Sequence, residues 1–179
     1  HDASTIIIEM RLRVLKLDEV AYSAVISAFE KGAQWPQALG VLSDMNIHRI
    51  QPGVIPYNAA ISACEKSARW REALGMLVDI RLRCMEPSVV TYNAAVSACE
   101  KGAHWQQALD VLVVMRQSRM QQNAITFGAT ISACAKGAKW RQALYMVKRL
   151  RVRRLEPENA HYSAAISSCE KNAMWDQAL

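Results

Sequence analysis

A tryptophan stands at every thirty-fifth residue of this chain, and other residues recur with the same step. The tryptophans are Trp35, Trp70, Trp105, Trp140 and Trp175, so each spacing is 35 residues (70 − 35, for example). An aromatic residue recurs in the same way at Tyr22, Tyr57, Tyr92, Phe127 and Tyr162, with no insertion between copies. A period of this length is typical of helical solenoids and repeat arrays. The chain is therefore one structural motif repeated, rather than a domain built around one active site.

The first half of each repeat has the pattern of an amphipathic helix. In the second copy, Tyr57, Ala60, Ile61 and Cys64 fall at i, i+3, i+4 and i+7, which places them on one apolar face. The helix is expected to end near residue 67, at a slot where Gly or Asn favours the left-handed conformation that often follows a helix. That slot holds Gly32, Ser67, Gly102, Gly137 and Asn172.

The second half of each repeat predicts another helix. Pro36 suits the first turn of such a helix, because that turn needs no N–H from it. The apolar positions again follow helical spacing, and in the second copy they are Trp70, Ala73, Leu74, Leu77 and Ile80. A helix breaker precedes the next copy at Pro52, Pro87 and Pro157, and Gln122 fills this slot in the third copy.

Each repeat is thus a helical hairpin, and one hairpin cannot bury its apolar faces alone. Stacked hairpins bury them in a continuous core, so the expected fold is all-α, an α-solenoid of helix-turn-helix hairpins. The low counts of glycine (7) and proline (5) favour helix, and no period-2 alternation predicts a strand. The expected boundaries are 19–53, 54–88, 89–123 and 124–158 for four complete repeats, 1–18 for the tail of a preceding repeat, and 159–179 for a truncated fifth.

These residues resemble the pentatricopeptide repeat (PPR) family. The resemblance rests on the 35-residue period, the aromatic-Asn pairs Tyr57-Asn58 and Tyr92-Asn93, a Lys ending the first helix, Ala-Leu early in the second, and Pro before the next repeat. The recurring Trp and the Cys-Glu-Lys run resemble those of algal members of the family. The tetratricopeptide repeat fits less well, because its period is shorter and its Trp-x-x-Leu-Gly-x-x-Tyr opening does not occur here. The resemblance implies a right-handed solenoid of P-type repeats that binds single-stranded RNA.

A polar stripe lies opposite the apolar face of the first helix. Its residues fall at i, i+4 and i+8, and in the second copy they are Asn58, Ser62 and Lys66. Lysines suit the phosphates of a single nucleic acid strand, and Asn or Ser can reach the edge of an unstacked base. The lysines expected to contact phosphate are Lys31, Lys66, Lys101, Lys136 and Lys171.

The resemblance implies that two positions in each repeat read a base. One directly follows the aromatic residue and the other is the last residue before the next repeat; together they form a reading pair. The pairs are Ser23 with Gly53, Asn58 with Ser88, Asn93 with Asn123, and Gly128 with Glu158, and Ser163 opens the fifth. In the family an Asn in the first position favours pyrimidines, so the second and third repeats are expected to read adjacent pyrimidines. Gly128 lacks a reading side chain, so the fourth repeat is expected to bind loosely or to act as a spacer.

The resemblance also implies that the residue two before the aromatic packs against the face of a base. These base-packing residues are Val20, Ile55, Val90, Ile125 and Ala160. The tryptophans lie in the apolar stripe of the second helix, so we expect them to pack in the core or between repeats rather than against bases.

Several of these residues also have purely structural interpretations. A Lys at a helix C-terminus interacts favourably with the helix dipole, and Ser or Asn in a first turn can act as a cap. The slot of Cys64, Cys99, Cys134 and Cys169 is filled by Phe29 in the first repeat, so it predicts packing residues rather than zinc ligands or disulfides. The run KRLRVRRLE at 148–156 predicts a solvated outer face, with contact to structured RNA or an acidic partner as the alternative.

The remaining features restrict the function further. The formal net charge of +6 and the pI of about 9.2 suit an anionic partner. No nucleophile–base set, phosphate loop or metal-ligand spacing occurs, so we expect no enzyme activity, cofactor or small-molecule substrate, and no apolar run reaches the roughly 18–20 residues of a membrane helix. The resemblance implies an organellar protein of the chloroplast or mitochondrion, its targeting peptide outside this chain, that acts in RNA stability, processing or translation. The alternative is a structural subunit of a large organellar assembly that contacts protein.

Overall fold

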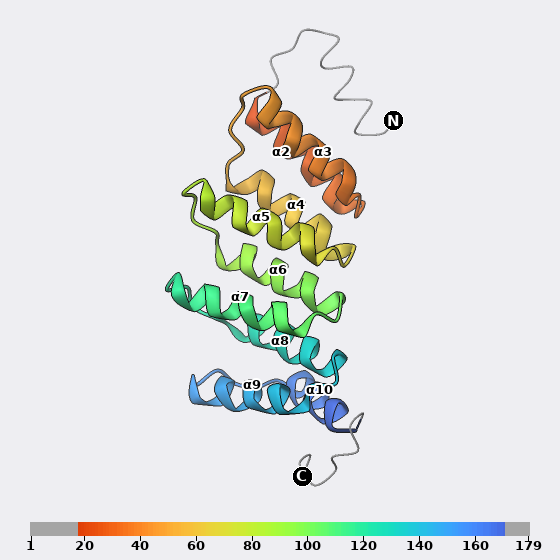
Figure 1. The fold of residues 1–179 in the computed structure, drawn as a ribbon, viewed down its shortest axis with the longest axis vertical. Coiled ribbons are helices and arrows are strands. Elements are labelled where there is room, and N and C mark those ends of the chain that lie inside the picture. Colours follow the sequence, from red (N-terminus) through yellow and green to blue (C-terminus); the bar gives the residue numbers. More distant parts are fainter. Residues whose placement is uncertain (1–17, 171–179) are drawn as a thin grey trace. The chain divides into compact units, whose positions relative to one another are not determined.

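The computed structural model describes residues 18–170, and between these residues the chain forms helices and no strand (Figure 1). It divides into two compact parts, residues 1–91 and 92–179, which are described separately. The expected all-α class is confirmed. The helices are α2 (Glu19–Lys31), α3 (Trp35–Ile47), α4 (Val54–Lys66), α5 (Trp70–Leu82), α6 (Val89–Lys101), α7 (Trp105–Gln117), α8 (Ala124–Lys136), α9 (Trp140–Val152) and α10 (Asn159–Glu170).

Within each part, consecutive helices form hairpins that stack on one another (Figure 1). In the N-terminal part α2 packs against both α3 and α4, and α4 packs against α3 and α5. In the C-terminal part α8 packs against α7, α9 and α10, and α10 also packs against α9. The first helix of a repeat therefore contacts its own second helix and the first helix of the adjacent repeat, as the solenoid prediction requires.

The apolar face predicted for the first helix is the core of the fold. Tyr57, Ala60, Ile61 and Cys64 are all buried in α4, and Phe127, Ile131 and Cys134 occupy the same positions in α8. The small Ala and Cys side chains allow helices to approach closely, while the aromatic ring fills the space at the start of each helix. Phe29 is buried in the slot that holds Cys in the other repeats. The prediction that this slot serves packing is confirmed.

The second helices bury one stripe and expose the other. Ala73, Leu77 and Ile80 are buried in α5, as expected, but Trp70 and Leu74 are only half-buried. Pro36 lies in the first turn of α3, where its missing N–H costs nothing. Trp175 and Lys171 lie outside the described residues.

The prediction for the turn between the two helices was wrong by one residue. Gly32 and Gly137 have φ values of −83° and −80°, and Ser67 has −100°. The left-handed residue is the next one along the chain, with φ between 53° and 58° at Ala33, Ala68, Ala103 and Ala138. Alanine tolerates this conformation at a cost of about 1 kcal/mol, so the glycines of this turn need another explanation.

Contact between repeats explains Gly137. A Cβ on Gly137 would lie 2.5 Å from Cδ1 of Trp105, the tryptophan of the preceding repeat, which packs over this turn. A Cβ on Gly32 would lie no closer than 3.5 Å to its nearest neighbour, an atom of Gln34. The Trp105 ring therefore requires a glycine at position 137 in the fourth repeat. No neighbouring atom requires one at position 32 in the first repeat.

These distances predict opposite effects for one substitution at two equivalent positions. Gly137→Ala should lower the free energy of unfolding by about 1–3 kcal/mol, because the added methyl displaces the Trp105 ring. Gly32→Ala should be neutral or raise it by up to roughly 1 kcal/mol, because it only restricts the unfolded chain. Urea unfolding followed by tryptophan fluorescence measures both. Equal losses at the two positions would contradict the assignment of Gly137 to packing.

Candidate nucleic-acid interface

The second member of each reading pair is the N-cap of the next first helix. Gly53 caps α4, Asn123 caps α8, and Ser88 directly precedes α6. The first member lies one turn into the first helix, so the two members belong to adjacent first helices. Ser23, Asn58, Asn93 and Gly128 are all half-buried, and Ser163 is exposed. The structure thus makes each reading pair a junction between two repeats.

A threonine that the sequence analysis had not singled out joins the second pair. Thr91 Oγ1 lies 2.6 Å from Asn58 Oδ1 and donates to it. The same hydroxyl accepts a hydrogen bond from the backbone N–H of Ser88 at 3.0 Å, and Ser88 Oγ accepts from the Thr91 N–H at 3.2 Å. This is a reciprocal capping box at the start of α6. The box holds the amide of Asn58 in place from the next repeat.

The third pair repeats this arrangement. Thr126 Oγ1 lies 2.6 Å from Asn93 Oδ1 and 2.7 Å from Asn123 Oδ1. Asn123 in turn accepts from the Thr126 N–H at 3.0 Å. The two reading residues also approach directly, with Asn93 Nδ2 3.4 Å from Asn123 Oδ1. The one sequence signal for these contacts was that Thr91 and Thr126 occupy the same slot.

The first pair is organised differently. Ser23 Oγ donates to the backbone carbonyl of Glu19 at 2.7 Å, within its own helix. The carboxylate of Glu19 accepts the N–H of Gly53 at 3.0 Å, and a Cβ on Gly53 would lie 2.5 Å from Oε1 of that carboxylate. Glu19 therefore occupies the space that a reading side chain at position 53 would need.

The fourth pair is filled by a histidine of the fifth repeat. A Cβ on Gly128 would lie 2.7 Å from Nε2 of His161, so the imidazole occupies the place of the missing side chain. His161 Nδ1 accepts the backbone N–H of Glu158 at 2.8 Å, which caps the start of α10. His161 is buried, with 6% of its surface exposed. The position expected to be empty is thus occupied by a polar ring.

The base-packing residues are exposed aliphatic side chains at the start of each first helix. Their exposed fractions are 73% for Val20, 70% for Ile55, 67% for Val90 and 64% for Ile125, and Ala160 is also exposed. These positions precede the first reading residue by three, so on a helix they lie beside it. Each repeat therefore places an uncovered apolar group next to a polar one.

The lysines expected to contact phosphate are exposed but are not all isolated. Lys66 Nζ lies 3.1 Å from the carboxylate of Glu30, and Lys136 Nζ lies 2.8 Å from that of Glu100. Glu100 also accepts a hydrogen bond from Ser132 Oγ at 2.8 Å. Lys31 and Lys101 are exposed. For Lys66 and Lys136 the partner is the Glu that precedes the helix-ending Lys of the preceding repeat. The sequence analysis did not predict these ion pairs.

Cation–aromatic stacking joins repeats just beyond the C-terminal ends of the first helices, at the end opposite to the reading pairs. The Arg69 guanidinium lies 4.3 Å from the ring centre of Trp35, and Lys139 Nζ lies 5.3 Å from that of Trp105. In each case the cation belongs to the repeat that follows the tryptophan. These contacts agree with the expectation that the tryptophans pack between repeats, and each is worth about 0.5–1 kcal/mol at a partly exposed site.

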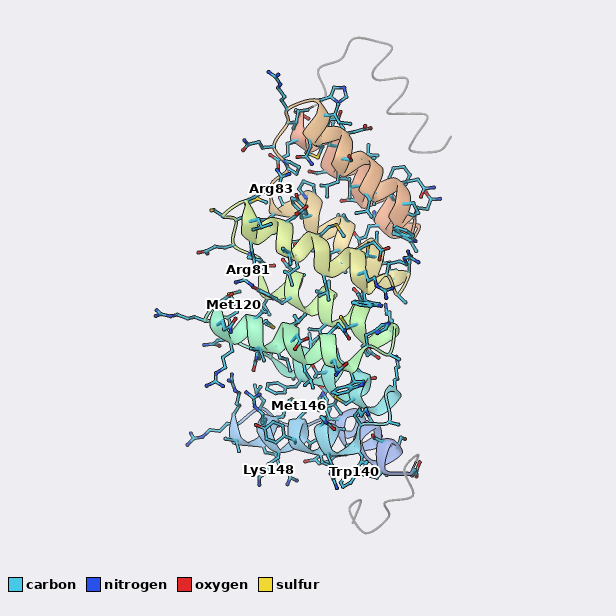
Figure 2. The ribbon with its side chains drawn as sticks, in the orientation of Figure 1. Arg81, Arg83, Met120, Trp140, Met146 and Lys148 are labelled. Carbon is cyan, nitrogen blue, oxygen red and sulfur yellow. The ribbon has the colours of Figure 1, made fainter. Side chains whose placement is uncertain are left out.

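Most cations of the basic run at 148–156, which begins on α9, are exposed as expected: Arg149 is half-buried, and Lys148, Arg151, Arg153 and Arg154 are exposed. Lys148 projects from this helix, which Trp140 begins (Figure 2). Arg151 lies over the ring of Tyr162 and donates to its hydroxyl at 3.1 Å, and Arg149 lies over Tyr145. Among the described residues, no carboxylate forms an ion pair with any cation of this run. In the N-terminal part, Arg83 at the end of α5 instead donates to Asn46 Oδ1 at 2.9 Å (Figure 2).

Residues 18–170 contain neither a metal site nor a membrane-spanning helix. No group of three or more His, Cys, Asp or Glu side chains in this range could hold a metal ion. No helix between the same residues is long and apolar enough to cross a membrane.

Comparison with known families identifies the fold. The family model described as "Pentatricopeptide repeat domain" matches residues 5–67 and 76–137, and the "PPR repeat" model matches residues 55–84. Because the matched residues make up more than half of the chain, the chain belongs to the pentatricopeptide repeat family. A search of curated proteins finds no match.

Solved structures with the same fold include three plant proteins. PPR10 from maize matches with a TM-score of 0.74 and 24% identity over 97% of this chain and 25% of PPR10, and its complex with an 18-nt psaJ RNA element matches at 18% identity. The PPR domain of Arabidopsis thaliana PRORP1, a protein-only RNase P, in complex with tRNA matches with a TM-score of 0.77. Its identity is 12% over 89% of this chain and 84% of that domain. Nuclear PRORP2 of A. thaliana matches with a TM-score of 0.78 and 8% identity, over 89% of this chain and 36% of PRORP2. This chain spans about a quarter of PPR10.

The buried cysteines predict the thiol chemistry of the native protein. Burial raises the pKa of Cys64 and Cys99 to about 12 and that of Cys134 to about 11, and it also raises the pKa of Cys169. These thiols are therefore protonated and unreactive at pH 8. Only Cys84 is exposed. Ellman's reagent should titrate one thiol in the native chain, none in Cys84→Ser, and all 5 cysteines of the wild type in denaturant.

Proposed function

We propose that this chain binds single-stranded RNA along its first helices, one base per repeat, with a preference set by the reading pairs. The observation that supports this most directly is the recurring neighbourhood of an exposed aliphatic residue and a half-buried polar one, as at Ile55 and Asn58. A nucleobase has a flat apolar face and a polar edge, so the face of one base can cover the aliphatic side chain while its edge forms a hydrogen bond with the polar one. The solved complexes of PPR10 with RNA and of the PRORP1 domain with tRNA support the proposal.

The charges suit the same ligand. An exposed lysine ends the first helix of every described complete repeat, and a lysine ladder can follow a phosphate backbone. The carboxylates of Glu30 and Glu100 lower the net charge of this row, because each pairs with a lysine. A phosphate must therefore compete with these carboxylates for Lys66 and Lys136.

The expected base preference follows from Asn58 and Asn93. By resemblance to the family, an Asn in the first reading position favours pyrimidines, and these residues belong to consecutive repeats. The chain is proposed to select RNAs with two adjacent pyrimidines. The first and fourth repeats have other groups at their reading pairs.

The proposed cellular role is in the stability, processing or translation of a chloroplast or mitochondrial transcript. This rests on family membership, and the occurrence of the fold in a nuclear protein, PRORP2, shows that the fold does not set the compartment. Binding rather than catalysis is proposed for this segment. The PRORP1 match is to the PPR domain of an enzyme, so a catalytic domain can accompany such repeats.

A second function, as a scaffold within an organellar assembly, has its own supporting observation. Three second helices, α3, α5 and α9, also end in exposed aliphatic residues, which are Ile47, Leu82 and Val152. The basic run of α9 adds cations that form no ion pair with a carboxylate of the described residues. Such a surface suits a protein partner with apolar and acidic groups.

Matched truncations of exposed aliphatic residues discriminate the two functions. Ile55→Ala and Val90→Ala should each weaken RNA binding about threefold to tenfold, because each removes apolar area next to a base. Leu82→Ala and Val152→Ala remove similar area from the second helices and should leave RNA affinity unchanged. Fluorescence anisotropy with a pyrimidine-containing RNA measures the affinities. The scaffold would be favoured if the substitutions on the first helices left RNA affinity unchanged and only Leu82→Ala and Val152→Ala caused the loss of a co-purifying protein partner.

Charge neutralisation tests the phosphate contacts. Glu30→Gln and Glu100→Gln should raise RNA affinity by severalfold and steepen its salt dependence, because Lys66 and Lys136 are released for phosphate. Each phosphate contact contributes about −0.7 to the slope of log affinity against log salt. Glu72→Gln is the control, because Glu72 pairs with Arg69 instead and the change in net charge is the same. An equal gain in all three variants would show that net charge alone is responsible.

A further inference from the structure

In three repeats, the third residue of the first helix lies against the first reading residue of the preceding repeat. Thr91 lies 2.6 Å from Asn58 Oδ1, and Thr126 lies 2.6 Å from Asn93 Oδ1. His161 occupies the space beside Gly128. We term Thr91, Thr126 and His161 the completing residues.

The threonine contact determines which end of the asparagine amide faces outward. A separation of 2.6 Å is typical of O–H···O and shorter than usual for N–H···O, so the amide oxygen faces the threonine hydroxyl. Thr91 Oγ1 accepts the N–H of Ser88, and its own proton is directed at Asn58 Oδ1, which at 2.6 Å is closer than Ser88 Oγ at 3.0 Å. In the third repeat the orientation has a second support, since Asn93 Nδ2 faces Asn123 Oδ1.

The outward group of each asparagine is therefore its amide nitrogen. Among the described residues, Asn58 Nδ2 has no hydrogen-bond partner, and Asn93 Nδ2 has only the long contact to Asn123. An amide NH2 is a donor only. The base that binds there must present an acceptor, such as the O2 or N3 of cytosine or a carbonyl oxygen of uracil.

His161 can supply the same kind of donor in the fourth repeat. Its Nδ1 accepts the N–H of Glu158, so the neutral imidazole carries its proton on Nε2. Nε2 is the ring atom nearest the missing side chain of Gly128, 2.7 Å from the point that a Cβ of residue 128 would occupy. The ring is held from two sides, by the cap of α10 and by close contact with α8.

We propose that the completing residue of the following repeat is a specificity-determining residue of each base site. Thr91 and Thr126 lock the amides of Asn58 and Asn93 as donors, and His161 replaces the absent side chain of Gly128 to form a further donor site for a base acceptor. This rests on the proposed binding of RNA. The first repeat is an internal contrast, because Pro56 stands in the equivalent slot and has no donor, and Ser23 bonds to its own helix.

The test compares hydroxyl removal with hydroxyl retention in the 179-residue chain. Thr91→Val and Thr126→Val keep the shape and remove the proton, whereas Thr91→Ser and Thr126→Ser keep the proton. Selection from a random RNA pool should show two adjacent pyrimidine positions for the wild type. Each Val variant should lose about threefold to tenfold of the pyrimidine preference, at one of the two positions and at a different one for each variant. The Ser variants should retain it.

Helix capping is separated from base reading by a third variant. Thr91→Val and Thr126→Val also remove a cap, so Asp18→Ala, which removes the 2.9 Å cap of Ala21 in α2, controls for that loss. It should lower stability without changing either pyrimidine position. Val variants that keep the wild-type preference, or Ser variants that lose it equally, would overturn the role of the hydroxyl.

The histidine site is tested by rebuilding it. His161→Ala should abolish base preference at the position adjoining the pyrimidine pair and leave the pair itself intact. The double variant Gly128→Asn with His161→Thr recreates the Asn–Thr pair and should extend the preference to three adjacent pyrimidines. No base preference at that position in the wild type, or none gained in the double variant, would overturn this site. A wild-type chain that selects no RNA at all would instead refute the proposed function, and this inference with it.

Discussion

The fold depends on the burial of a first helix, such as α2 or α8, between its own second helix and the first helix of the next repeat. In α4, Tyr57 and Ile61 are buried together with Ala60 and Cys64, and each large buried side chain contributes about 1.5–3 kcal/mol. No single hairpin can bury this face alone. The small residues set how closely the helices approach, and that spacing determines how far the polar group of one repeat lies from that of the next.

The surface left uncovered by this packing is the candidate interface, and its polar groups serve two purposes. Glu100 and Lys136 form an ion pair between adjacent first helices, and Thr126 caps its own helix while it contacts Asn93. Groups that would recognise RNA therefore also join repeats. Base preference and stability are coupled in such an array, because a substitution at one of these residues changes both.

The two glycines of the reading pairs show how the array departs from a uniform code. Glu19 occupies the space beside Gly53 and His161 occupies the space beside Gly128, so each missing side chain is replaced by a polar group of different character. A carboxylate only accepts hydrogen bonds, whereas a neutral imidazole with its proton on Nε2 donates one at that atom. Repeats of nearly identical backbone can thus present different chemistry.

The sequence by itself determined the helices, their 35-residue step and the buried faces, because these follow from apolar spacing along a single helix. It correctly placed Cys64 and Phe29 in one packing slot. It misplaced the left-handed residue by one position, at Gly137 rather than Ala138, because the glycine is required by contact with Trp105 and not by backbone conformation. The shared slot of Thr91 and Thr126 was its one signal for the contacts to the asparagines, and it did not show that Thr91 orients Asn58 or that His161 fills the place beside Gly128. Only the tertiary structure decided these, because each joins residues 33 apart (91 − 58 and 161 − 128) across two packed helices, where side-chain geometry and not local periodicity sets the contact.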